Sequence, residues 1–269
     1  MDRRDVCILI NSTPKYYYIL PFMVGMLKRY APELQWPIIF ATESPEHFIS
    51  KALVREYQVQ ILEIPTSSAG FLESRLVALQ RLQKEYKYCL PLQDDFILEG
   101  PMNAIAIRHL LYIMDEDSDI VSARLMPCPG PRGSKELNCI ELPDWRYLSP
   151  KVDTYGFVFQ ATLWSLPACV KWYSKIVDVL NEIAPKDKCT PSQRIQQELG
   201  VNLAENSQGQ DIFWKLSAIE GYKHIAWIRK GSQPNAVYLS PFPYRPTAIV
   251  RGSLEGWAQD LAKREGFTI

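Results

Sequence analysis

The sequence predicts an α/β fold of Rossmann type, in which helices flank a mainly parallel sheet. In the first 130 residues, apolar runs of strand length alternate with longer amphipathic stretches, a pattern typical of βαβ units. The loops after these runs are polar, as expected at the edge of such a sheet where ligands bind. A chain of 269 residues, 47% of them hydrophobic, can form one large α/β domain or two small ones.

The first half of the chain supplies the core of the predicted sheet. Its apolar runs predict strands at Asp5–Asn11, Pro37–Ala41, Gln58–Ile64, Tyr88–Leu92 and Ile120–Leu125. The amphipathic stretches between them predict helices at Tyr16–Tyr30, Pro45–Tyr57, Phe71–Tyr86 and Met102–Met114. Four strands are followed by polar loops, namely Asn11–Pro14, Thr42–Pro45, Pro65–Gly70 and Gln93–Asp95. Because parallel strands end at one edge of a sheet, these loops are expected to meet.

The alternation of apolar runs and amphipathic stretches stops after Pro127, where a loop rich in Pro and Gly extends to Asn138. Beyond it we expect strands at Thr154–Leu163 and His224–Arg229, helices at Leu166–Ile183, Thr190–Gly200 and Asp211–Glu220, a Pro-studded segment at Ser232–Pro246 and a short terminal helix. No internal repeat or low-complexity linker separates the halves. We therefore expect a single domain over residues 1–269, with an elaborated half from residue 127.

Composition excludes several classes of protein. The 30 basic and 30 acidic residues balance, which argues against a nucleic-acid-binding surface over the whole body of the protein. The apolar run at Val6–Ile10 is too short for a signal peptide, and no window reaches the ~18 apolar residues of a membrane helix. The six cysteines contain no C-x-x-C pair. These features predict a cytoplasmic protein with reduced cysteines and no zinc site.

The sharpest chemical feature is the pair Asp94 and Asp95, directly after the apolar strand at Tyr88–Leu92. Adjacent like charges at a strand end repel each other unless a cation lies beside them. Hard oxygen ligands of this kind suit Mg²⁺ or Mn²⁺ that carries the phosphates of a substrate. The alternative is a turn with two solvated aspartates.

Arg75 is the second feature, because it falls on the apolar face of the preceding helix. This face consists of Leu72, Leu76, Leu79, Leu82 and Tyr86. A guanidinium there needs an anionic partner, either the acidic pair or a bound diphosphate. Alternatively, Arg75 extends past the helix start into water.

Taken together, these residues resemble a GT-A glycosyltransferase. In that superfamily a loop with a glycine leads into a helix with a small-Arg-Asn motif, and the next strand ends in a D-x-D motif. Here the order is Gly70, Ser74-Arg75, and then Gln93-Asp94-Asp95 after the strand. Two positions depart from the pattern: Leu76 replaces the Asn, and Gln93 replaces the first Asp.

The resemblance implies a nucleotide-sugar-binding half at 1–126 and an acceptor half at 127–269. It places the nucleotide sugar on Asn11, Ser12, Thr13, Glu43, Arg75, Gln93, Asp94 and Arg251. It makes Asp95 the main ligand of Mn²⁺ or Mg²⁺, helped by Asp94, with His224 as a further candidate. His224 also alternates with Ala226 and Ile228 on one strand face, which is typical of a core histidine.

The second half resembles the superfamily more weakly. Asp211, in LAENSQGQDIFWKL, is the first candidate for the catalytic base and Glu205 the second. Asp211 is equally suited to cap a helix. Tyr244, Arg245 and Arg251 resemble a late segment that closes over the diphosphate, and a loop held by prolines is the alternative.

The resulting hypothesis is a glycosyltransferase that moves a sugar from a nucleotide-diphosphate sugar to an acceptor hydroxyl on a glycan or another molecule. Metal and Arg75 would offset the charge on the leaving diphosphate while a carboxylate accepts the hydroxyl proton, a route that implies inversion. A sugar nucleotidyltransferase and a catalytically inactive nucleotide-binding protein are the alternatives. The expected partners are the donor and the acceptor, with no nucleic acid and with a homo-oligomer left open.

Overall fold

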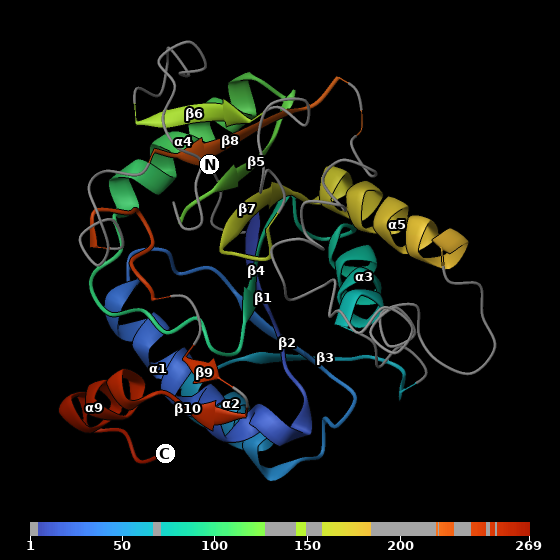
Figure 1. Ribbon diagram of the computed structural model, residues 1–269. Coiled ribbons are helices and arrows are strands. Elements are labelled where there is room, and N and C mark those ends of the chain that lie inside the picture. The colour runs from blue at the N-terminus through green and yellow to red at the C-terminus, as the bar shows by residue number, and fades with distance from the viewer. Residues whose placement is uncertain are drawn as a thin grey trace.

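An eight-stranded sheet forms the centre of the protein in the computed structural model (Figure 1). The structure describes residues 5–66, 71–126, 144–148, 158–183, 219, 221–228, 238–245, 248–250 and 252–269. The strands are β1 (Val6–Asn11), β2 (Ile38–Thr42), β3 (Gln60–Glu63), β4 (Tyr88–Gln93), β5 (Ile120–Arg124), β6 (Trp145–Leu148), β7 (Thr162–Ser165), β8 (Lys223–Trp227) and the separate hairpin β9 (Ile249–Val250) and β10 (Ser253–Leu254). The helices are the 3-10 helix η1 (Pro14–Ile19), α1 (Leu20–Tyr30), α2 (Phe48–Tyr57), α3 (Phe71–Leu82), α4 (Ala104–Glu116), α5 (Leu166–Ile183) and α9 (Gly256–Glu265).

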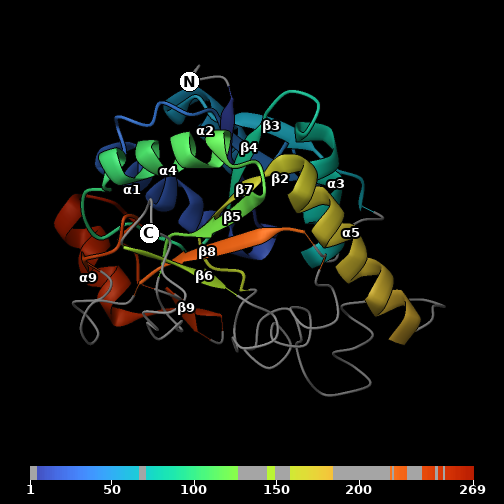
Figure 2. The same ribbon diagram turned by 90° about the horizontal axis from the view of Figure 1, so that it is seen from above.

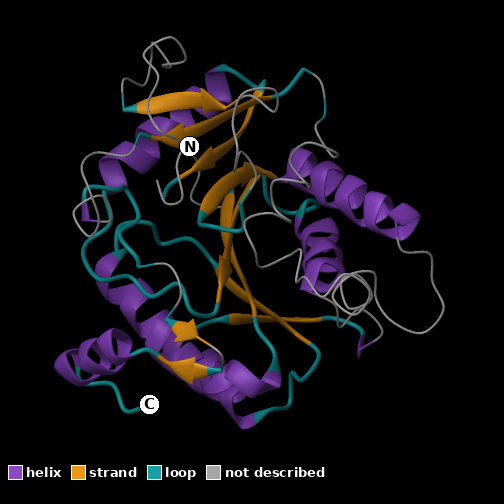
Figure 3. Cartoon of the chain, viewed as in Figure 1, coloured by secondary structure: helices purple, strands orange, loops and turns teal. Residues whose placement is uncertain are grey.

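The strand order of the sheet is β3-β2-β1-β4-β7-β5-β8-β6. Strands β1 to β4 pair in parallel, as do β5 and β8, whereas β7 and β6 pair antiparallel with their neighbours. The sheet is thus mainly parallel, which confirms the predicted fold class. Strand β7, from the second half of the chain, lies between β4 and β5 of the first half, and β8 and β6 continue the same sheet beyond β5 (Figure 3).

Helices cover both faces of the sheet (Figure 2). Apolar residues of α1, α2, α4 and α9 join one buried cluster with alternate residues of β1 and β2, such as Ile8 and Ile38. The other cluster contains residues of α3 and α5 together with the opposite strand faces, such as Leu9 and Ile39. Strands buried on both sides are apolar at almost every position, which is why they read as continuous runs in the sequence.

Some predicted elements differ from the observed ones. The expected helix Tyr16–Tyr30 is divided into η1 and α1, because Pro14 and Pro21 each lie in the first turn of a helix and Pro21 lacks the N–H that a continuous helix would need. The strand expected at Thr154–Leu163 is observed at Thr162–Ser165, and residues 154–157 lie outside the described part.

Other elements were predicted correctly or lie beyond the described residues. Helix α5 has its predicted bounds, Leu166–Ile183. Strand β6 and the hairpin of β9 and β10 were not predicted, because strands of two to four residues leave no periodicity to detect. The helix expected at Thr190–Gly200 and nearly all of that at Asp211–Glu220 lie outside the described residues. No helix in the described ranges is both long and apolar enough to cross a membrane.

Candidate functional site

A cavity of about 190 Å³ opens where β1, β2, β3 and β4 end. It is lined by Asn11, Ser12, Thr13, Tyr16, Ala41, Glu43, Ile64, Phe71, Ser74, Gln93 and Asp94. The chain leaves β1 toward β2 on one side and β4 toward β5 on the other, so the strand order reverses between β1 and β4. Such a switch point leaves a crevice at the carboxyl ends of the strands, and ligands of open α/β sheets bind there.

The loop after β1 is joined to the loop after β4 by a side-chain hydrogen bond. The Ser12 hydroxyl donates to Asp94 Oδ2 at 2.5 Å. Residues Asn11 and Gln93 are register partners at the last positions of β1 and β4, so their loops start level with each other. The sequence separates Ser12 from Asp94 by 82 positions, and the parallel pairing of β1 with β4 brings them together.

Asp94 and Asp95 have different surroundings although they are adjacent. Asp94 lines the cavity, whereas Asp95 is 7% exposed and is not among the lining residues. Burial and, to a smaller extent, the neighbouring Asp95 charge raise the pKa of Asp94 to about 7, against the opposing effect of the Ser12 hydrogen bond. Of the two carboxylates, Asp94 is the one that lines the cavity, and the role of Asp95 as the main metal ligand stays a prediction.

Arg75 is buried beneath the cavity. The alternative prediction, that its side chain extends past the start of the helix into water, is therefore wrong. It is 1% exposed, and its guanidinium donates to the carbonyl of Leu92 at 3.2 Å, to Asn11 Oδ1 at 3.4 Å and to the Tyr173 hydroxyl at 3.5 Å. The same guanidinium lies 4.9 Å from the Phe71 ring centre. Arg75 thus connects α3 to the ends of β1 and β4 and to α5, and its charge lowers the pKa of Asp94 from behind the cavity wall.

Glu43 reaches the cavity from a tightly organised turn after β2. The Thr42 hydroxyl accepts the backbone N–H of Ser44 at 2.9 Å and forms a short hydrogen bond with the buried Tyr17 hydroxyl. The carbonyl of Ser44 in turn accepts the hydroxyl of Ser50 at 3.0 Å. These bonds fix the backbone on both sides of Glu43, so its position at the rim is set by main-chain geometry.

Aromatic and apolar residues complete the cavity, and most were not anticipated as site residues. Phe71 packs edge-to-face on Phe159, with ring centres 5.1 Å apart, and Gln93 donates to the Phe159 carbonyl at 3.4 Å. The position of Phe71 directly after the polar loop 65–70 was the available signal. Tyr16 also lines the cavity, as one of three successive tyrosines beside the first loop.

The side chains that line the cavity supply some, but not all, of the ligands that a hard divalent cation needs. In the ranges that the structure describes, no group of three or more His, Cys, Asp or Glu side chains is arranged to hold a metal ion. Mg²⁺ and Mn²⁺ are commonly held by one or two carboxylates while substrate phosphates and water supply the other ligands. Asp94 lines the cavity together with Gln93, and its carboxylate fits that kind of site.

His224 does not belong to this site, which corrects its assignment as a metal ligand. It lies near the start of β8, level with Ser122 of β5 and away from the carboxyl ends of the parallel strands. It is 3% exposed, its Nδ1 lies 2.7 Å from the Ser122 hydroxyl, and its ring packs edge-on against Trp172 at 4.7 Å. Strands β7 and β5 lie between β4 and β8, which places the imidazole roughly three strand spacings, about 14 Å, to the side of β4.

Arg245 and Tyr244 are engaged in structural contacts. Arg245 forms a two-pronged ion pair with Glu99, with N–O distances of 3.0 and 2.9 Å, and stacks over Trp257 at 4.6 Å. The buried Tyr244 hydroxyl accepts the N–H of Ala161 at 2.9 Å. This agrees with the alternative of a held loop. The other predicted residues of the second half, Asp211, Glu205 and Arg251, lie outside the described residues, as does Gly70.

The sequence matches no protein-family model and no curated protein. Its fold is similar to that of S. aureus TarS 1–349, with a TM-score of 0.45 and 13% identity over 84% of this chain. The complex of TarS 1–349 with UDP-GlcNAc gives a TM-score of 0.44 at 12% identity over 88% of this chain. The chain spans 59% and 62% of those two TarS chains.

A protein of another kind has a fold that is similar to this chain at a comparable TM-score and sequence identity. 4-diphosphocytidyl-2C-methyl-D-erythritol synthase from Anaerococcus prevotii matches with a TM-score of 0.43 and 10% identity, over 88% of this chain and 97% of that one. These similarities concern the fold alone. The central sheet itself is mainly parallel and flanked by helices, as the predicted α/β fold class requires.

Proposed function

We propose that the protein is a glycosyltransferase that binds a nucleotide-diphosphate sugar in the cavity at the ends of β1 to β4. One observation carries the proposal: six residues expected from the sequence to bind the nucleotide sugar line this one cavity. They are Asn11, Ser12, Thr13, Glu43, Gln93 and Asp94. They come from three separate loops, and the parallel pairing of the strands brings them to one edge.

The chemistry of the cavity suits a nucleotide. Phe71 and Tyr16 offer rings for contact with a base, and Glu43 and Gln93 offer acceptors for ribose hydroxyls. The Asn11 Nδ2 is buried at the cavity and has no acceptor among the described residues. Because a buried donor without a partner is costly, a ligand oxygen at this position would be favoured.

A divalent cation at Asp94 would offset the charge of the leaving diphosphate. Arg75 would assist by its buried positive charge and by holding Asn11 in place, without touching the phosphates. The base that accepts the proton of the acceptor hydroxyl is expected at Asp211, with Glu205 as the second candidate, so the proposed transfer is inverting.

A binding screen tests the donor proposal directly. UDP, GDP, dTDP and CMP sugars are each added with and without Mn²⁺, and the melting temperature is measured. A ligand at 100 times its Kd stabilises the fold by roughly 2.7 kcal/mol, which this measurement resolves. Failure of every nucleotide sugar to stabilise the protein in either condition would contradict the proposal.

Transfer activity then separates the two candidate bases. Asn retains the capping ability of Asp but does not accept a proton at neutral pH, so Asp211→Asn should melt like the wild type and lose about 10²-fold or more in rate. Glu205→Gln is the matched control and should keep most activity. Loss of activity in Glu205→Gln alone would move the base to Glu205, and pyrophosphate-dependent turnover would indicate a nucleotidyltransferase instead.

A further inference from the structure

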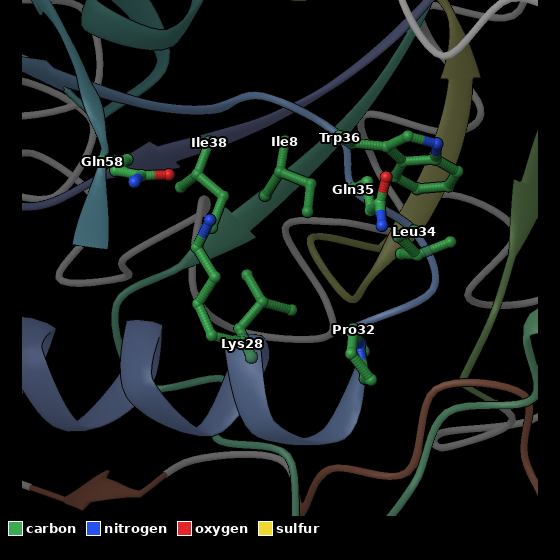
Figure 4. A pocket seen from close by; sticks show the side chains of 10 residues that line it. Ile8, Lys28, Pro32, Leu34, Gln35, Trp36, Ile38 and Gln58 are labelled. Atoms are coloured by element: carbon green, nitrogen blue, oxygen red, sulfur yellow. The ribbon is translucent and has the colours of Figure 1, made fainter.

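A second cavity, of about 320 Å³, is shown in Figure 4. Its lining residues include Ile8 and Ile38 near the starts of β1 and β2, at the opposite end of the sheet from the first cavity. Its floor is formed by apolar residues that are at most 8% exposed, namely Ile8, Leu27, Ala31, Leu34, Trp36 and Ile38. Ile8 and Ile38 pair across β1 and β2 and belong to the face that α1 covers. The first cavity lies where the same strands end, so the two cavities are separate.

The mouth of this second cavity is polar. Lys28 rises from the last turn of α1 beside the apolar floor, and Gln58 and Gln35 flank it from the end of α2 and from the loop before β2 (Figure 4). The neighbouring Arg29 is paired with Glu265, whereas Lys28 makes no ion pair or hydrogen bond with the described residues. The Lys28 side chain is exposed, so its ammonium is solvated and is free to pair with an anion that binds over the apolar floor.

The two glutamines have an unusual backbone conformation. Gln35 has a φ of 48° and Gln58 a φ of 57°, and the described residues contain no other non-glycine residue with positive φ. Gln58 ends α2 in the left-handed position at which glycine is favoured. Residues held in such conformations are concentrated at ligand sites, and both of these line the same cavity.

We propose that this cavity is a second ligand site, which takes a small carboxylate with a flat apolar body. The body would lie on the floor beside the Trp36 ring, and the carboxylate would accept hydrogen bonds from the Lys28 ammonium and from the side-chain amides of Gln35 and Gln58. At the ~30 Å³ that a water molecule occupies in the liquid, the volume holds roughly ten non-hydrogen atoms. This is the size of a phenyl ring with an acetate group.

The test compares three probes by calorimetric titration of the whole chain. Phenylacetate has both the body and the charge, phenylacetamide has the body alone, and acetate has the charge alone. Phenylacetate is expected to bind with a Kd of about 1 mM or tighter, and the other two at least roughly fivefold more weakly. The proposal is overturned if phenylacetate does not bind at 10 mM, or if acetate or phenylacetamide binds equally well.

Variants then place the probe in this cavity. Lys28→Gln should weaken phenylacetate binding about tenfold, the effect of one charge-assisted hydrogen bond, while the control Lys51→Gln on α2 should leave it unchanged. Gln58→Gly should raise the melting temperature by relieving the left-handed backbone and should weaken binding at the same time. Unchanged binding in Lys28→Gln and Gln58→Gly would overturn the proposal even if the probe binds elsewhere.

Discussion

The Ser12 hydroxyl and the Asp94 carboxylate meet at 2.5 Å and so join the ends of β1 and β4 across the switch point of the sheet. The bond favours the ionised carboxylate, whereas burial favours the protonated one, and burial is the larger effect. Asp94 is therefore poised to change its charge near neutral pH, at the place where a cation and a diphosphate would lie. A bound cation would favour the ionised form strongly.

Asp94→Asn should separate the binding role of this carboxyl from its effect on stability. The folded-state pKa of about 7 exceeds the ordinary value of 3.8, so the folded protein binds the extra proton and the stabilisation is lost as pH rises from about 4 to about 7. Asn imitates the protonated form, so the variant should melt several degrees higher than the wild type at pH 8, roughly 2–4 °C per kcal/mol, and only slightly higher at pH 4. It should also lose the Mn²⁺-dependent part of donor binding.

Thermal melts at both pH values and donor titrations in Mn²⁺ and in EDTA measure these effects. Asp260→Asn, on the exposed face of α9, is the control and should change neither. Mn²⁺-dependent donor binding that persists in Asp94→Asn would remove Asp94 from the proposed cation site.

Arg75→Leu should destabilise the protein, although leucine would suit the apolar face of α3. The guanidinium satisfies the carbonyl of Leu92 and the hydroxyl of Tyr173 inside the protein, and leucine leaves both without their donor. The expected loss is about 2–4 kcal/mol of unfolding free energy, with weaker donor binding through the displaced Asn11. Denaturant unfolding measures the first effect and donor titration the second.

Arg81→Leu is the matched control, because Arg81 lies on the exposed side of the same helix. It should cost less than about 1 kcal/mol. A more stable Arg75→Leu protein with unaltered donor binding would show that the buried network is dispensable.

The sequence predicted the parallel core and the cavity residues well for a physical reason. Strands buried on both faces must be apolar throughout, and polar loops must follow them, so Asn11, Glu43 and Asp94 could be placed at one edge from pattern alone. The direction of a side chain is set by packing that no pattern records. The sequence therefore did not show that Asp94, and not Asp95, lines the cavity, and it did not identify the partners of Arg75.

The second half of the sheet was predicted less well, because its strands are short and pair antiparallel. His224 alternates with apolar residues, which indicated a core histidine as readily as a ligand, and only the strand order shows that β8 is three positions from β4. Arg245 resembled a phosphate-binding residue until Glu99, 146 positions away, proved to be its partner.

Gly25→Ala should loosen the C-terminal end of the chain from α1. A Cβ at this position would lie 2.4 Å from the Phe267 ring, which packs on Phe22 at 5.1 Å and beneath Arg29 at 5.4 Å. The ring must move, at a cost of about 1–3 kcal/mol for overpacking, and this cost is reduced by the ~1 kcal/mol that alanine gains over glycine inside a helix. Chemical denaturation measures the cost, and limited proteolysis reports release of the C-terminal end.

Gly100→Ala serves as the comparison, because a Cβ added to Gly100 would have no described atom within 4 Å. Adding Phe267→Ala to Gly25→Ala should recover part of the loss. A Gly25→Ala protein more stable than the wild type by about 1 kcal/mol, the gain of alanine in an unobstructed helix, would mean that the tail is not packed on α1 in solution.

His224 should make the protein sensitive to acid. Burial lowers its pKa from 6.5 to about 3, so the folded protein holds it neutral while the unfolded chain accepts a proton below pH 6.5. The contribution of neutral His224 is thus fully present above pH 6.5, and between pH 6 and pH 4 it declines by about 1.4 kcal/mol per pH unit. His224→Gln removes the titrating group, so its unfolding free energy should start lower at pH 7, because of lost contacts with Trp172, and fall less steeply toward pH 4. Urea unfolding at half-unit pH steps measures both slopes.

His109→Gln is the control, because that side chain is exposed on α4 and its loss should leave the slope unchanged. Parallel pH profiles for the wild type and His224→Gln would mean that His224 is protonated in the folded protein and has solvent or a counter-charge at hand.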